Sequence, residues 1–289
     1  MTRKRTKNLK IELIILAIVV IIAGYRYYKK MNAASLVEDT IELHIIDVGQ
    51  GDSVLLKSEA GNILIDAGTG ESEEDLSYYL SSVGVESFEY CIFTHPHEDH
   101  IGGADMIIEN YDVRNVIISP AVTTTRTFEN LIDALERSEA NVIEARPDLT
   151  YKVGDVEILI MGPSALEDRD LNNSSVITRI SYGAVRMMFT GDAEEIQEGD
   201  ILERYSVFDL DCYFLKMGHH GSSTSCSRDF MNAVSPSVAA ISCGKGNSYG
   251  HPHSETIKNL DSLGIEYHRT DYMGDIVYVC DGMTIGLKK

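Results

Sequence analysis

The stretch THPHEDHIGG, residues 94 to 103, places four metal-competent side chains within six positions: His95, His97, Asp99 and His100. The apolar residues 88 to 94 predict a short buried strand before it, and Gly102-Gly103 lets a helix begin directly behind it. Imidazole and carboxylate together suit zinc, with manganese and iron as harder alternatives. Two His separated by one residue can converge on one ion, while the adjacent Asp-His pair turns towards a second. A polar surface loop is the alternative, but three His this close have no packing rationale.

His-x-His-x-Asp-His ahead of a Gly pair resembles the metal signature of the metallo-β-lactamase fold hydrolases, and it is matched here without a gap. The resemblance implies an α/β fold, a four-layer αββα sandwich, and we expect it to occupy residues 36–289. It also implies that these four side chains bind metal. Asp99 is in addition a candidate for passing a proton to the leaving group.

The residues before the cluster predict an antiparallel meander of three strands, IELHIIDVG, SVLLKSE and NILIDAG, between residues 41 and 68. The loop DVGQGDS, residues 47 to 53, resembles the opening loop of the ComEC/Rec2 competence-protein branch of the fold. Asp66, at the end of NILIDAG, matches the family's first motif, whose Asp orients a ligand His from behind the metal. A helix is expected over residues 73 to 83.

The residues after the cluster repeat this alternation of strands and helices. Residues 115 to 119 predict a strand, and Phe128, Leu131, Ile132 and Leu135 recur at the spacing of an amphipathic helix. Residues 151 to 161, broken at Gly154-Asp155, predict a hairpin. Two runs of strands and helices are consistent with two sheets packed face to face and covered by helices on both outer sides.

LNNSSVITRI, residues 171 to 180, occupies the place where many members of the fold carry a third His on the first metal, and it contains no His. The run Asn172 to Ser175 matches the ComEC-like branch instead. Asn173 and Ser174 are therefore expected to support the metal ligands from behind. The missing His leaves the first metal with fewer protein ligands.

Two further motifs complete the expected ligand set. VRMMFTGDAEE places Asp192 directly after a strand and Gly191, as in the family motif whose carboxylate bridges two metals. YFLKMGHHGSS places His219 and His220 where the family supplies its last ligand. One should bind metal and the other face substrate, and the sequence does not decide which. We take His220 as the ligand and His219 as the catalytic residue.

GKGNSYGHPHSETIKNL, residues 244 to 260, contains two further His. His251 resembles the closing His of the ComEC-like branch and is a catalytic candidate, whereas His253 is expected to cap or flank the following helix. Lys216 and His251 are expected near a bound phosphate, together with the member of the His219/His220 pair that does not bind metal. His44 and His268 lie in strand-like runs and are interpreted as structural.

The first thirty residues carry eight Lys and Arg against one acid, around an apolar stretch. We expect residues 1–35 to form a cytoplasmic basic tail, a membrane anchor and a linker, with residues 11–28 in the membrane. The apolar gap is only about 24 Å long as a helix, so a span requires basic side chains that snorkel. A cleaved signal peptide is the alternative, but no small-x-small site follows closely. Five basic residues before the span and three after it predict a cytoplasmic N-terminus and an extracytoplasmic catalytic domain.

The remaining residues carry 17 Lys and Arg against 44 Asp and Glu, a net charge of −27. Because sequence-independent grip on nucleic acid depends on basic side chains, no extended nucleic-acid-binding surface is expected. The five Cys form no CxxC and are odd in number, so no full disulfide framework is expected. Cys91, Cys212 and Cys280 are expected in the core.

The resemblance implies a hydrolase that holds one or two Zn²⁺, or Mn²⁺, and attacks its substrate with metal-bound hydroxide. Phosphodiester hydrolysis is our first hypothesis, since NNSS, TGD and HHGS also resemble the teichoic-acid phosphorylcholine esterases over most of residues 41 to 270. The charge favours small or end-presented phosphodiesters as substrates. Two alternatives stay open: an amide or ester hydrolase such as a β-lactamase or thioesterase, and a binding module with a degenerate metal site.

Overall fold

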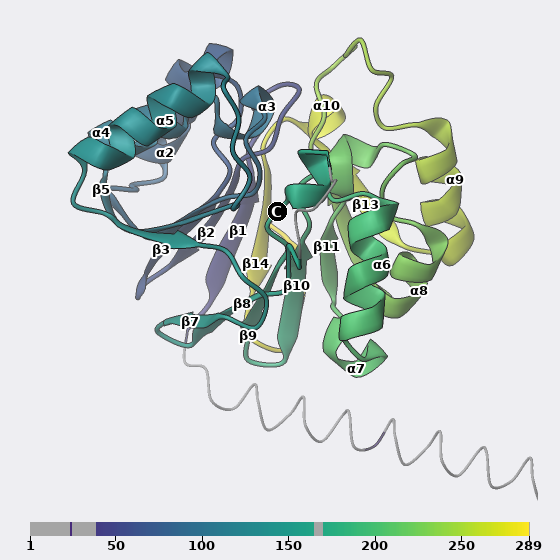
Figure 1. The fold of residues 1–289 in the computed structure, drawn as a ribbon. Helices are drawn as coiled ribbons and strands as arrows, with labels where there is room; N and C mark the ends of the chain where they lie inside the picture. The colour runs from purple at the N-terminus through teal and green to yellow at the C-terminus, as the bar shows by residue number, and fades with distance from the viewer. Residues whose placement is uncertain (1–23, 25–38, 165–169, 289) are drawn as a thin grey trace, which may run out of the picture.

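Two β-sheets lie face to face in the computed structural model, which describes residue 24, residues 39–164 and residues 170–288 (Figure 1). Helices α2 (Glu73–Ser82), α4 (Ala104–Asn110) and α5 (Arg126–Arg137) cover the first sheet. Helices α6 (Glu195–Arg204), α8 (Arg228–Val234) and α9 (Ser254–Leu263) cover the second. The predicted α/β fold of two sheets between layers of helices is confirmed for the described residues.

Within the described part of the chain, the first sheet has eight strands. In spatial order they are β15 (Ile285–Leu287), β14 (Ile276–Cys280), β1 (Ile41–Ile45), β2 (Val54–Ser58), β3 (Gly61–Ile65), β4 (Ser87–Phe93), β5 (Asp112–Ile118) and β6 (Asn141–Glu144). The predicted meander is β1 to β3, which pair antiparallel. From β3 to β6 the pairing is parallel, so their carboxyl ends meet at one edge.

The second sheet has seven strands. In spatial order they are β13 (Glu266–Arg269), β12 (Val238–Ile241), β11 (Phe214–Lys216), β10 (Val185–Phe189), β9 (Thr178–Tyr182), β8 (Val156–Ile160) and β7 (Thr150–Val153). The predicted hairpin is β7 with β8. From β10 to β13 the pairing is parallel, so this sheet also gathers carboxyl ends at one edge.

The remaining elements are short. They are the helices α3 (Glu98–Ile101), α7 (Val207–Leu210) and α10 (Thr270–Met273) and the 3₁₀ turns η1 (Gly70–Ser72), η2 (Asn172–Ser174) and η3 (Gly218–Gly221). Three of them, α3, η2 and η3, lie in stretches that the sequence marked as functional. Short turns of this kind hold polar side chains at a strand end without extending the layers.

The core has three parts that match the four layers. One apolar cluster lies between the sheets, and one lies under the helices of each sheet. β1 shows how the strands serve both sides, since Ile41, Leu43 and Ile45 face the other sheet. His44 points the opposite way, and its Nδ1 lies 2.7 Å from the Tyr79 hydroxyl of α2. Alternation along the strand therefore fixes which residues line each layer.

The described residues contain neither a disulfide bond nor a helix able to span a membrane. All five Cys are buried and free, and Cys91, Cys212 and Cys280 lie in the core, where they were expected. Among the described residues, no helix combines the length and apolarity that crossing a bilayer requires. The anchor predicted over residues 11–28 lies, except for Gly24, outside the described residues, so that prediction stays untested.

Candidate metal centre

The candidate ligands lie on three loops that leave the carboxyl ends of parallel strands. The loop after β4 carries His95 and His97 and runs into α3, the loop after β10 carries Asp192, and η3 follows β11. Gly191 adopts a left-handed φ of +52°, and a Cβ there would lie 2.8 Å from the Thr94 side chain. Only glycine lets the Asp192 loop approach the His95 loop this closely.

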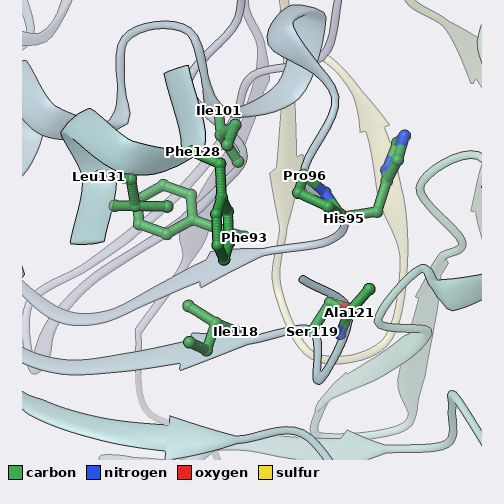
Figure 2. A pocket seen from close by; sticks show the side chains of 9 residues that line it. All are labelled: Phe93, His95, Pro96, Ile101, Ile118, Ser119, Ala121, Phe128 and Leu131. Atoms are coloured by element: carbon green, nitrogen blue, oxygen red, sulfur yellow. The ribbon is translucent and has the colours of Figure 1, made fainter. Parts of the chain in front are cut away.

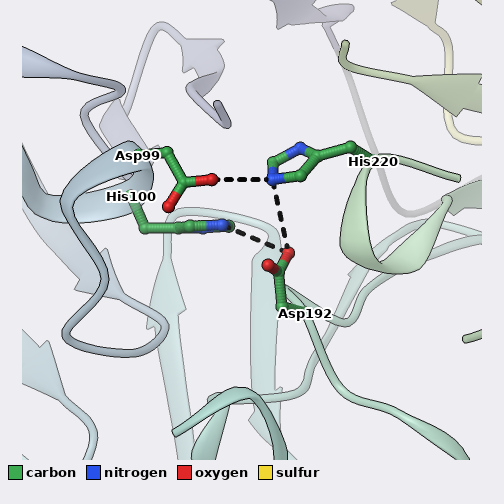
Figure 3. A group of neighbouring side chains, drawn as sticks. All are labelled: Asp99, His100, Asp192 and His220. Atoms are coloured by element: carbon green, nitrogen blue, oxygen red, sulfur yellow. Dashed lines mark hydrogen bonds and ion pairs between the residues drawn. The ribbon is translucent and has the colours of Figure 1, made fainter. Parts of the chain in front are cut away.

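Four side chains form what we call the buried cluster: Asp99, His100, Asp192 and His220 (Figure 3). His100 Nε2 lies 3.1 Å from Asp192 Oδ1, and His220 Nε2 lies 3.7 Å from the same oxygen. Asp99 Oδ2 is 3.1 Å from His220 Nε2. Two atoms that share one zinc ion at about 2.0–2.2 Å from each lie about 3 to 4 Å apart. These spacings fit a shared divalent cation.

The second group is the histidine pair, His95 and His97, which shares Asp192 with the buried cluster. His95 Nε2 lies 3.0 Å from His97 Nδ1 and 3.8 Å from Asp192 Oδ2. The two Asp192 oxygens thus face different groups. This is the arrangement expected of a carboxylate that bridges two metal positions.

The protonation pattern of the buried cluster leaves ring nitrogens free for a metal. His220 Nδ1 lies 3.2 Å from Ser242 O, which can only accept, so Nδ1 keeps its proton and Nε2 is the nitrogen that can exchange its proton for a metal. His100 Nδ1 likewise faces Asp66 at 2.7 Å. His100 Nε2 and Asp192 Oδ1 are buried and lie 3.1 Å apart, with no well-aligned hydrogen bond to each other or to another described group. Such orphaned polar atoms fit a divalent cation and are otherwise costly.

Asp66 holds His100 from behind, as the sequence motif led us to expect. Its two oxygens accept from the Thr94 N–H and hydroxyl, each at 2.7 Å, and Oδ2 also accepts from His100 Nδ1. Asp66 itself has a left-handed φ of +59°. A buried carboxylate on the far nitrogen fixes both the tautomer and the orientation of a ligand imidazole.

Asp52 holds His220 in a comparable way, although the sequence did not assign it this role. Asp52 Oδ1 lies 3.2 Å from His220 Nδ1, and Oδ2 accepts from Lys216 Nζ at 2.8 Å. Lys216 is only 2% exposed and also donates to Met217 O. The expectation that Lys216 lies near a bound phosphate is therefore wrong, because its charge is committed to Asp52. The resemblance of DVGQGDS was the one sequence signal pointing at this loop.

In the metal-free protein, the charged groups of the buried cluster stabilise each other's charges. Burial opposes protonation of His220, but Asp192 and Asp52 outweigh it and raise its pKa to about 9. Burial likewise opposes protonation of His100, yet Asp192 and Asp66 raise the pKa of its imidazole well above the usual value. Burial would raise the pKa of Asp192, but His100 and His220 lower it well below the usual value. A cation would replace the protons on these rings.

Residues 172–175, where many members of the fold carry a third His, have amide and hydroxyl side chains instead. Asn173 Oδ1 accepts from the N–H groups of Glu194 and Gln197, and so holds the loop that follows Asp192. Ser174 donates to Leu171 O and does not contact a candidate ligand through its hydroxyl. Ser175 takes the position expected of Ser174: its Oγ accepts from Asp192 N–H at 3.0 Å and lies 3.4 Å from His95 Nδ1.

The two histidines of η3 point to different places. Both have left-handed backbones, with φ of +47° at His219 and +54° at His220, a conformation seldom adopted by residues other than glycine. His220 is buried in the cluster. His219 is partly exposed, with Nδ1 3.0 Å from Glu194 Oε1 and Nε2 3.7 Å from Asp192 Oδ2. The structure thus places His220 with the metal ligands and His219 at their rim.

His251 joins this rim and His253 does not. The ring centroid of His251 lies 5.4 Å from that of His219 and 6.2 Å from that of His220. His253 is the N-cap residue of α9, as expected, and its Nδ1 accepts from Ser223 N–H. His268 binds the Tyr278 hydroxyl through Nδ1 at 2.8 Å, as a structural residue does.

A small recess lies on the far side of His95, under α5 (Figure 2). Its volume is about 10 Å³, which holds about one water molecule. Its lining is mostly apolar and consists of Phe93, His95, Pro96, Ile101, Ile118, Ser119, Ala121, Phe128 and Leu131. The recess is therefore too small for a substrate group.

Comparison with known families agrees with this geometry. The model of the "Metallo-beta-lactamase superfamily" matches residues 46–245, which include every candidate metal ligand named above. Among solved structures, the metallo-beta-lactamase fold protein YhfI from Bacillus subtilis superposes with a TM-score of 0.58 at 13% identity. That match covers 84% of this chain and 100% of the other. At such low identity it supports the fold alone.

The curated sequence relatives agree with the expected ComEC/Rec2 branch, and one of them is named as a competence protein. The chain is 29% identical to "ComE operon protein 3" of Bacillus subtilis over 82% of its length and 33% of the relative's. It is 27% identical to "Competence protein ComA" of Neisseria gonorrhoeae over 90% of its length and 35% of the relative's. The chain thus spans about a third of the length of the curated relatives that it matches.

Proposed function

Because the chain belongs to the metallo-β-lactamase superfamily, we propose that it is a metal-dependent hydrolase of phosphodiester bonds. The observation that carries the proposal is the convergence of three loops on Asp192, whose oxygens face the histidine pair on one side and the buried cluster on the other. Zn²⁺ is the ion that this set of imidazole and carboxylate donors suits best, and Mn²⁺ is the alternative.

The residues present would hold two ions in different ways. His95, His97 and Asp192 would bind the first, and Asp99, His100, Asp192 and His220 the second. Bound divalent ions supply a nucleophile by acidifying water and polarise the scissile oxygen. The chain's own side chains then fix the ligands: Asp66 holds His100, and Asp52 holds His220.

The rim supplies the groups that can move protons. Asp99 is partly exposed, and the His220 and His100 charges beside it offset its burial and lower its pKa to about 2. It can therefore accept a proton only transiently during turnover. His219 and His251 lie beside the site with ring centroids 5.4 Å apart, and His219 is the group placed to donate to a leaving oxygen. Burial and the neighbouring His220 charge lower the pKa of His251 to about 4, so its ring is neutral near pH 7.

Two observations guide the choice of substrate. One relative is named "Competence protein ComA" of Neisseria gonorrhoeae and another "Recombination protein 2" of Haemophilus influenzae. We take recombination to point to DNA, whose backbone consists of phosphodiester bonds. The net charge of −27 on residues 31–289 opposes a long polyanion, so we propose small or end-presented phosphodiesters as substrates.

We also propose that residues 11–28 anchor the chain in the cell membrane as a single span. The basic residues on both sides of the apolar stretch support this proposal, as does their excess before it. The N-terminus would be cytoplasmic and the hydrolase domain extracytoplasmic. Protease added to intact cells should then remove the domain, whereas protection of the domain would contradict this orientation.

The experiment for the activity compares substrates on one preparation of the full chain. We expect turnover of bis(p-nitrophenyl) phosphate and of single-stranded oligonucleotide, and slower turnover of duplex with equal nucleotide content. Asp192→Asn should abolish it, while the matched control His268→Gln, a structural His away from the site, should not. Hydrolysis of a β-lactam or thioester without any phosphodiester cleavage would contradict the proposal.

A further inference from the structure

The loop of residues 244–251 presents an exposed aromatic ring beside the candidate metal centre. Tyr249 leaves 67% of its surface exposed, the most exposed ring in this loop. Its ring stacks on that of His251, with centroids 5.6 Å apart and planes 23° apart. His251 in turn stacks on the ligand His220 at 6.2 Å and 30°. Three rings, tilted by 23° and 30° from one to the next, thus lead from the surface to the buried cluster.

Hydrogen bonds hold this loop in place, so the Tyr249 ring has a fixed position at the surface. Asn247 Nδ2 donates to Gly244 O and His251 O, and its Oδ1 accepts from His251 N–H. Gly244 N–H donates to Gln50 Oε1 across the site. A braced loop loses little conformational freedom when a ligand binds to it.

A second brace reaches Tyr249 itself. His253 Nδ1 accepts from Ser223 N–H at 2.9 Å, so its proton lies on Nε2, which donates to Tyr249 O at 3.3 Å. Among the described residues, no other aromatic ring or guanidinium contacts the Tyr249 ring. Its outer face is therefore open, whereas Tyr272, the other large exposed tyrosine near this end, already stacks with Arg269.

The local charge and the His251 ring also point to a ligand. Residues 242–254 contain Lys245 and no Asp or Glu, in a domain that is otherwise strongly acidic. His251 is only 9% exposed, and its Nδ1 is buried without a hydrogen-bond partner among the described residues. This segment of the chain therefore adds no negative charge of its own beside the candidate metal centre.

We infer that Tyr249 is a stacking platform for the nucleobase next to the scissile phosphate, so that the substrate is a nucleotide or the end of a single strand. The inference rests on the proposed phosphodiesterase function and names its substrate class. A phosphate at the buried cluster has its base one sugar away, which matches a route along the ring series from His220 to Tyr249. Stacking on an aromatic ring accepts any base and needs few basic residues, which suits an acidic domain.

The first test reads binding without relying on turnover. The chain has no Trp, so Tyr249→Trp in the full-length protein creates one fluorophore at the platform. We expect saturable quenching by deoxyadenosine monophosphate and none by 2-deoxyribose 5-phosphate, which lacks the base. Tyr78→Trp is the matched control, because Tyr78 is 78% exposed on α2, outside this site, and should respond to neither. No saturable quenching at position 249, or equal quenching by both probes, overturns the inference.

The second test measures the contribution to turnover. Tyr249→Ala should lower kcat/KM on oligothymidylate by about 10- to 100-fold, the range found for one base–aromatic stack. The same variant should leave an oligomer that is abasic beside the cleaved bond unchanged, and Tyr249→Phe should retain the wild-type rate on both. Equal losses on both oligomers would mean a structural role and overturn the inference.

The outcomes separate this inference from the proposed function. If the wild type cleaves base-bearing and abasic oligomers equally, the phosphodiesterase stands and the platform fails. If the wild type cleaves neither oligomer while the nucleotide quenches the fluorescence of the Tyr249→Trp variant, the nucleotide site stands and the proposed hydrolysis fails.

Discussion

The candidate ligand histidines on the two sides of Asp192 are held by different chemical groups. On the side of the buried cluster, each ring is fixed by a carboxylate: Asp66 on His100, and Asp52 on His220. On the side of the histidine pair, the described residues place only the hydroxyls of Thr94 and Ser175 near His95 Nδ1, at 3.2 and 3.4 Å. A carboxylate raises the basicity of a ligand imidazole and orients it more firmly than a hydroxyl does.

This difference indicates which of the two metal positions should bind its ion more tightly. The position formed by the buried cluster keeps two fully supported rings and two carboxylates. The position at the histidine pair lacks the third His that many members of the fold carry, and its place is taken by Ser175. We expect two positions of unequal affinity, with the tighter ion in the buried cluster.

The largest effect is expected from the residue that both sides share. Asp192→Asn should lower kcat/KM on a phosphodiester by on the order of 10³-fold or more, since one change weakens both ion positions and metal chemistry supplies several kcal/mol. Kinetics with saturating Zn²⁺ would check this. If Asp192→Asn keeps more than a tenth of the activity, the bridging role is contradicted.

The next effect compares the supporting groups directly. Asp66→Asn and Asp52→Asn should each weaken metal binding by about 10- to 100-fold, which is usual when a partner of a ligand His is lost. Ser175→Ala should cost only a few-fold, because a neutral hydrogen bond contributes about 0.5–1.5 kcal/mol. Ser174→Ala is the matched control and should leave metal affinity unchanged. Competition with a fluorescent chelator measures the metal affinity of all four variants. Equal losses of affinity in Ser175→Ala and Asp66→Asn would contradict the difference between the two sides of Asp192.

A further expected effect, at unchanged sequence, is a pH dependence confined to the buried cluster. His220, whose pKa is raised to about 9 in the metal-free protein, holds a proton at pH 7 that an ion must displace. That proton stabilises the metal-free fold fully below the unfolded His pKa of about 6.5, and the stabilisation is lost as the pH rises through about 9. Metal affinity should therefore rise about tenfold per pH unit for this group and level off above pH 9. Calorimetry in buffers of different ionisation enthalpy counts the released protons. Finding none at pH 7 would contradict the account.

Local motifs allowed much of the fold and site to be predicted from the sequence. His95, His97, Asp99 and His100 are neighbours in the chain and share one strand-to-helix connection, so their convergence requires no knowledge of distant packing. The strand alternation around residues 41 to 68 and the amphipathic spacing of α5 likewise depend on local periodicity. Asp66 was found because its motif places it at a strand end.

The rest depended on contacts between the two sheets. Asp52 lies on the loop between β1 and β2 of the first sheet, and Lys216 lies 164 positions later at the end of β11 in the second. Their ion pair was therefore not visible in the sequence, and Lys216 was wrongly expected at the phosphate. Ser175, and not Ser174, contacts the candidate ligands because the 3₁₀ turn η2 ends at Ser174. The sequence alone does not show where this turn ends. The placement of His220 inside and His219 at the rim follows from left-handed backbones that a strand-end loop does not reveal.

The most direct test of the unequal metal positions is the metal content of the full chain after dialysis against increasing chelator. We predict loss in two steps, with a plateau at one ion per chain. A His95→Gln, His97→Gln double variant should keep that last ion, whereas His220→Gln should lose it. A wild type without metal, or a plateau that survives in His220→Gln and vanishes in the double variant, would contradict the account.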